Sequence, residues 1–190
     1  MSKNGGIIGV SDHGGWEVLV TVEPDGTLLD RRIELVDAGL LKLPHHHEGQ
    51  GLPLDKAVEL VERVRVSAER HAMLALDGVT MALPRILGVA LRKCPQLPPT
   101  IAERIKDYRA QNVADWVMSR KALASAAETR GWPVCWYDVK TVLGAASQVL
   151  GVENLDAHFL QVRRAVGPPW DKDHKLSIAA ALVTASAVVE

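Results

Sequence analysis

The first third of the chain contains three short runs of apolar and β-branched residues with no helical periodicity among them, and this feature restricts the fold most. The last two runs are joined by a turn in which Pro24 fixes φ and Gly26 permits positive φ. In the third run Ile33 and Leu35 alternate with charged residues, which indicates a strand with one solvent-exposed face. We therefore predict an antiparallel meander. Its strands cover residues 7–10, 18–22 and 28–36.

After this meander the pattern alternates between helices and strands. Thr100 and Glu103 have the spacing of a capping box, and Gly131 is suited to the end of the helix that follows. This order predicts an α/β fold with a five-stranded mixed sheet covered by helices, in one domain of residues 1–190. We expect strands at 86–90 and 134–139, and helices at 54–76, 100–130, 141–151, 154–166 and from Asp171 onward.

Charge and hydropathy exclude several classes of protein. The chain has 22 Lys and Arg against 23 Asp and Glu, a net charge of -1. This balance fits neither a strongly basic protein that coats nucleic acid nor an acidic disordered chain. Its most apolar stretch, residues 176–189, is shorter than the roughly 20 residues that span a bilayer. Cys94 and Cys135 lie outside any CxxC pair, and no signal-peptide pattern is present. We predict a cytoplasmic protein with reduced thiols and no membrane partner.

Three short motifs resemble those of one superfamily. A glycine-rich turn follows an acid at the end of the first strand, a late strand leads through a lysine into a helix, and the last helix is alanine-rich with acids at its start. The order of elements and these motifs resemble the ribonuclease H-like superfamily, most closely its Holliday-junction resolvase branch. The motifs are GVSDHGG at residues 9–15, VCWYDVKTVLG at 134–144 and DKDHKLSIAAA at 171–181.

The resemblance implies a ribonuclease H-like fold and a metal-dependent reaction. In that superfamily, carboxylates from the first strand, the fourth strand and the last helix hold two divalent ions that cleave a phosphodiester bond, and oxygen ligands suit Mg²⁺ or Mn²⁺. By this resemblance Asp12, Asp171 and Asp173 are the catalytic metal ligands. His174 beside them is a further ligand or a proton carrier.

The sequence departs from the superfamily pattern at the fourth strand. Where an acid is expected near its end, this chain has Arg92, Lys93 and Cys94, and a charged lysine cannot coordinate Mg²⁺. Asp77 is the only acid close by in the sequence. Lys93, and Lys140 after the fifth strand, are instead candidates for binding the phosphates of a nucleic-acid partner.

The candidate residues also have structural explanations. Asp12 can stabilise the glycine turn through its side chain, and Asp171 is well placed to cap the last helix. Asp173 then lies in the first turn, where the helix dipole favours an acid, and His174 is a surface or capping residue. Lys140 fits an exposed lysine before a helix equally well.

Three consecutive histidines, His45, His46 and His47, occur in a predicted loop. Neighbouring residues of a strand face opposite sides, so all three can reach one metal only from a loop. His71 stands alone on its helix, and no zinc-ligand spacing completes such a site. We interpret these histidines as incidental to a solvated loop, with a transition-metal or pH-responsive site as the alternative.

Two functional hypotheses follow. The first is a Mg²⁺-dependent phosphodiesterase or nuclease that uses the acids of the first strand and the last helix. The second is a non-catalytic domain of the same fold, with a degenerate site, that binds a partner or self-associates as a homodimer. Sugar kinases and actin-like ATPases share the superfold but need two such domains around a cleft. The missing fourth-strand acid favours the second hypothesis, and convergence of the three acids would favour the first.

Overall fold

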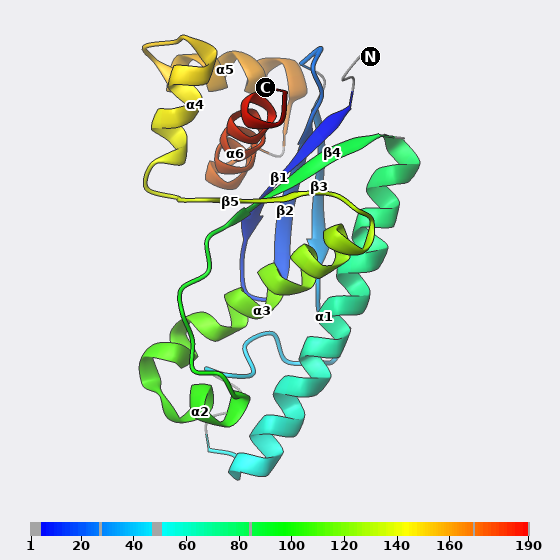
Figure 1. Ribbon diagram of the computed structural model, residues 1–190, viewed down its shortest axis with the longest axis vertical. Coiled ribbons are helices and arrows are strands. Elements are labelled where there is room, and N and C mark those ends of the chain that lie inside the picture. The colour runs from blue at the N-terminus through cyan, green and yellow to red at the C-terminus, as the bar shows by residue number, and fades with distance from the viewer. Residues whose placement is uncertain (1–4, 27, 47–50, 84, 169, 190) are drawn as a thin grey trace.

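The computed structural model describes residues 5–26, 28–46, 51–83, 85–168 and 170–189, and its centre is a five-stranded mixed sheet in the order β3-β2-β1-β4-β5 (Figure 1). β1 pairs antiparallel with β2, and β2 pairs antiparallel with β3. β4 runs parallel to β1 on its other side, and β5 runs parallel to β4. The predicted meander and the parallel pairing of the first and fourth strands are confirmed. The strands are β1 (Gly6–Asp12), β2 (Trp16–Val22), β3 (Leu28–Glu34), β4 (Ile86–Arg92) and β5 (Val134–Tyr137).

Helices cover both faces of the sheet, and alternation along β1 decides which side chains meet which helices. Ile8 and Val10 pack with residues of α1 and α3, whereas Ile7 packs on the other face with residues of α4, α5 and α6 (Figure 1). The sheet is therefore a partition between two apolar cores. The helices are α1 (Leu54–Ala82), α2 (Ile101–Lys106), α3 (Tyr108–Thr129), α4 (Val142–Leu150), α5 (Leu155–Val166) and α6 (Lys172–Val189).

α6 lies unusually close to the central strand, and Gly9 makes this approach possible. A Cβ atom at Gly9 would lie 1.8 Å from the carbonyl oxygen of Ser177, which no side chain could tolerate. The Ser177 hydroxyl donates a hydrogen bond to the carbonyl of Val18, 3.2 Å away, which ties the helix to β2 as well. This close packing brings the first turn of α6 to the end of β1.

Sequence and structure differ in the region predicted as one helix at 100–130. The chain forms two helices there, because Asp107 leaves helical geometry and its carboxylate accepts hydrogen bonds from the N–H groups of Arg109 and Ala110. The predicted capping box of Thr100 and Glu103 is present at the start of α2. The third strand ends at Glu34, earlier than predicted, and α1 extends beyond the predicted end to Ala82.

Cys94, which follows β4, and Cys135, in β5, are both free thiols. Within the described parts of the chain, no helix is both long enough and apolar enough to cross a membrane.

Candidate functional site

Asp12 ends β1, and its side chain points to the α3 face of the sheet. Its Oδ2 accepts a hydrogen bond of 2.6 Å from Nη2 of Arg120, and both side chains are almost completely buried. Arg120 also donates through Nη1 to the backbone carbonyl of Lys93, 3.0 Å away. The predicted bond between Asp12 and the glycine turn is thus replaced by an ion pair that links β1, α3 and the end of β4.

A second acid, Glu17 of β2, lies directly opposite Asp12 in the antiparallel register. It is fully buried, and neither of its carboxylate oxygens has a hydrogen-bond partner among the described residues. Burial, with a smaller contribution from the charge of Asp12, raises the pKa of Glu17 well above its usual value, and Arg120 opposes the shift. Burial lowers the pKa of Arg120, but the hydrogen bond to Asp12, the charge of Asp12 and a smaller contribution from Cys94 together outweigh it, so the net shift is upward.

The acids at the start of α6 lie on the other face of the sheet from Asp12. Oδ1 of Asp173 accepts a hydrogen bond of 2.8 Å from the Ser11 hydroxyl, and its Oδ2 lies 3.0 Å from Nε2 of His13. Asp171 accepts hydrogen bonds from the backbone N–H groups of Asp173 and His174, at 2.8 and 3.3 Å. This is the capping role predicted for Asp171, at the N-terminus of α6.

His174 is buried rather than on the surface. Its Nδ1 lies 2.9 Å from Oδ1 of Asp171, and its Nε2 lies 2.8 Å from Oδ2 of Asp30. Burial raises the pKa of the Asp171 carboxyl, but bonds from His174 and the backbone outweigh it and lower the pKa overall. His174 therefore joins the start of α6 to β3, and Trp170 stacks against its ring at 5.9 Å.

The structure thus divides the four predicted catalytic residues between two faces. Asp12 faces α3, whereas Asp173, Asp171 and His174 gather near α6, because successive residues of β1 point in opposite directions and Ser11 faces α6. No group of three or more His, Cys, Asp or Glu side chains within the described ranges is placed to hold a metal ion. The divalent ions implied by the resemblance do not fit this arrangement, since the carboxylates they would need are separated or already bonded.

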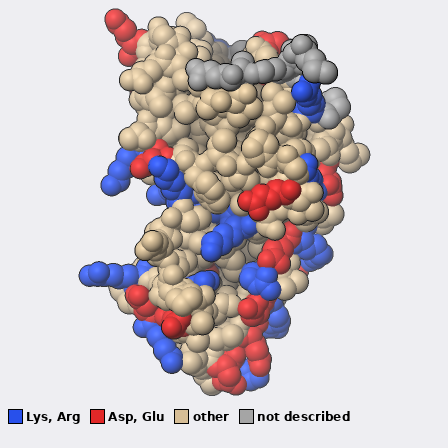
Figure 2. Space-filling model, viewed as in Figure 1, with Lys and Arg blue, Asp and Glu red and all other residues tan. Residues whose placement is uncertain are grey.

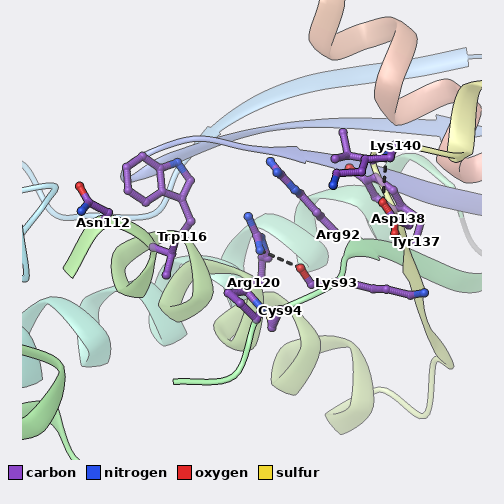
Figure 3. A pocket seen from close by; sticks show the side chains of 12 residues that line it. Arg92, Lys93, Cys94, Asn112, Trp116, Arg120, Tyr137, Asp138 and Lys140 are labelled. Carbon is purple, nitrogen blue, oxygen red and sulfur yellow. Dashed lines mark hydrogen bonds between the residues drawn. The ribbon is translucent and has the colours of Figure 1, made fainter. Parts of the chain in front are cut away.

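The predicted phosphate-binding residues, by contrast, lie together in one pocket of about 500 Å³ where β4 and β5 end (Figure 3). Lys93 and Lys140 are exposed and Arg92 is partly exposed. None of these three cations forms an ion pair with a described residue. Figure 2 shows basic side chains around a hollow on this face. The pocket also contains Trp116, Asn112, Arg120 and Asp138.

The histidine loop has a different role from the one predicted. The side chain of His45 is 1% exposed, and its Nδ1 lies 2.6 Å from Oδ1 of Asp115 on α3, which is equally buried. The interpretation of His45 as incidental is therefore wrong, because this residue fixes the loop to the helix. His47 lies outside the described residues. His71 bonds to Asp37, 2.9 Å away.

Glu17, Arg120 and Asp115 are among the residues of these networks that were not predicted from the sequence. Glu17 is two residues from Leu19 on β2, so its side chain lies on the same core-facing side of the strand. Arg120 is buried on α3, one helical turn after Trp116. Asp115 is also buried on α3. A charged residue on a predicted buried face needs a partner, and this signal could have identified all three.

The fold is similar to that of RuvC, as comparison with solved structures shows. Thermus thermophilus RuvC in complex with a Holliday junction substrate superposes with a TM-score of 0.51 and 14% identity, covering 95% of this chain and 92% of that one. A second Thermus thermophilus RuvC structure gives a TM-score of 0.49 and 15% identity, covering 97% and 96%. Comparisons with protein-family models and with curated sequences give no match.

Proposed function

We propose that residues 1–190 form one ribonuclease H-like domain that binds the phosphate backbone of nucleic acid and does not cleave it through a metal cluster. The observation that carries this proposal is the pocket at the ends of β4 and β5, with Arg92, Lys93 and Lys140 unpaired by described acids. The similar fold of RuvC, whose structure contains a Holliday junction, makes branched DNA the first substrate to test.

Charge compensation behind the pocket supports the same proposal. Arg120 neutralises Asp12, and burial favours the uncharged form of Glu17. Asp138 is the one acid among the described residues that line the pocket. The local charge is therefore positive although the net charge of the chain is -1. Such a surface gains affinity for phosphates by releasing the counterions of the nucleic acid.

The first test is a salt titration of binding. The triple substitution Arg92→Gln, Lys93→Gln and Lys140→Gln is expected to weaken binding to a fluorescently labelled four-way DNA junction, measured by anisotropy. It should also flatten the dependence of log K on log salt by about 0.9 for each phosphate contact that is lost. Because the substituted side chains keep hydrogen-bonding capacity but lose charge, this change in slope reports phosphate contacts directly.

A matched control removes three exposed cations that do not line the pocket, through Lys56→Gln, Arg63→Gln and Arg164→Gln. It should keep the wild-type slope. The same complexes, incubated with Mg²⁺ or Mn²⁺, should contain intact DNA. The proposal fails if the wild-type protein does not bind DNA. It also fails if the protein cleaves DNA and loses this activity on substitution of Asp12→Asn or Asp173→Asn.

A further inference from the structure

The tryptophan of the pocket, Trp116, differs from Trp16 and Trp170 in its ring contacts. Trp16 stacks on His13 at 3.8 Å and beneath Arg32, and Trp170 packs near Phe159 and His174. Trp116 makes no comparable ring or cation contact with any described residue, although it is partly exposed and lines the pocket. A partly exposed indole in a basic pocket offers a flat surface on which a base can stack.

Hydrogen bonds hold in place the part of α3 that carries Trp116. Arg120 lies one helical turn further along α3 and is anchored by Asp12 and by the carbonyl of Lys93. Nε of Arg120 is buried without a hydrogen-bond partner among the described residues. Asn112, one turn before Trp116, donates to the carbonyl of Tyr108, which leaves its amide oxygen as an acceptor. Polar groups therefore flank the ring on both sides along the helix.

The cations of the pocket are spread rather than gathered at one point. In Figure 3 the Arg92 side chain extends toward the Trp116 side of the pocket, whereas the Lys93 side chain runs the other way and Lys140 lies beyond Arg92. A single phosphate group would be bound best by cations gathered at one point. Cations distributed along a pocket fit the successive phosphates of a strand.

We infer that this pocket binds one unpaired nucleotide of a nucleic-acid strand, with its base stacked on Trp116 and the flanking phosphates near Arg92, Lys93 and Lys140. This inference rests on the proposed function and names the form of nucleic acid that the same site prefers. The volume of about 500 Å³ lies within the range of small-ligand pockets and suits an unstacked nucleotide. A base within a duplex is already stacked and paired, so it cannot enter without leaving the helix.

The test compares single-stranded DNA and blunt duplex DNA, with 2-aminopurine in the single strand as a stacking probe. Trp116→Ala should weaken single-strand binding about 5- to 150-fold, the usual contribution of one base–aromatic stack, and should abolish quenching of the probe. Duplex affinity and the salt slope should not change, because no phosphate contact is removed. Trp116→Phe should retain part of the affinity. Trp136→Ala, which changes an exposed tryptophan of β5 outside the pocket, is the matched control.

The outcomes separate the two proposals. If the wild-type protein binds no nucleic acid, the proposed function itself fails. If it binds, but Trp116→Ala leaves single-strand affinity unchanged or weakens duplex binding equally, only the nucleotide pocket is wrong. A free mononucleotide that binds more tightly than the strand would also overturn the inference, because the separated cations would then contribute nothing. Circular dichroism and melting temperature establish that each variant is folded.

Discussion

At the end of β1, the position of a residue along the strand decides on which face of the sheet its side chain lies and which partners it can bond to. Ser11 and Asp12 are neighbours, yet Ser11 bonds to Asp173 on one face of the sheet and Asp12 bonds to Arg120 on the other. An acid at the first of these positions would have lain beside Asp173. An acid at the second lies instead in a buried ion pair, where removing one partner leaves an uncompensated charge.

Glu17 leads to a prediction about pH. Its pKa is raised in the folded state by burial, so the unfolded chain, with an ordinary glutamate pKa of about 4.3, loses its proton first as the pH rises. In the window above that value the unfolded state binds fewer protons than the folded state, and stability falls with increasing pH. Glu17→Gln, which cannot ionise, should lack this decrease.

Urea unfolding of both proteins from acidic to mildly alkaline pH measures this difference. We expect Glu17→Gln to be the more stable protein at neutral pH, and the two to converge below about pH 4.3, where both side chains are neutral. Equal stability at low pH would show that the substitution does not itself alter packing. Parallel pH profiles for the two proteins would contradict an upward shift at Glu17.

At the scale of elements, α3 connects parts of the chain that are distant in sequence. Asp115 binds the loop at His45, Arg120 binds the end of β1 at Asp12, and Trp116 between them lines the pocket. The partners of Asp115 and Arg120 are 70 and 108 residues away. Helical periodicity predicts which face of such a helix is buried, but it does not predict which distant side chain meets a charge on that face.

The pair of His45 and Asp115 allows a quantitative prediction. Both side chains are buried, so His45→Ala or Asp115→Ala alone should lower the free energy of unfolding by about 3–5 kcal/mol, because each leaves the other partner unpaired. The double variant should lose less than the sum of the two, since it leaves neither group unpaired. Chemical denaturation of the four proteins of this cycle measures the coupling. Additive losses would mean that the two residues do not interact in solution.

At the scale of the whole molecule, local patterns predicted the architecture well. The alternation of Ile33 and Leu35, the turn at Gly26 and the capping box at Thr100 each depend on a few adjacent residues, and the elements they predict are present. The division of the candidate site could not be predicted in the same way. It depends on which residue of β1 faces α6, and a shift of one residue reverses that assignment.

The sheet separates two groups of charged residues. It places one basic pocket at the ends of β4 and β5 and keeps the charged carboxylate of Asp12 away from the acids of α6. A two-metal site needs carboxylates that converge on ions about 3.5–4 Å apart. The described residues supply no such group. Arg92, Lys93 and Lys140 line one pocket instead.

Mn²⁺ binding to the protein alone tests this separation most directly. Free Mn²⁺ gives a six-line electron paramagnetic resonance signal that weakens when the ion is bound, so a titration measures uptake without any nucleic acid. We predict that the wild-type protein leaves the signal at its buffer amplitude, as do Asp12→Asn and Asp173→Asn. Stoichiometric uptake of Mn²⁺ that disappears in both variants would show that the two acids share a metal ion, and would contradict the account.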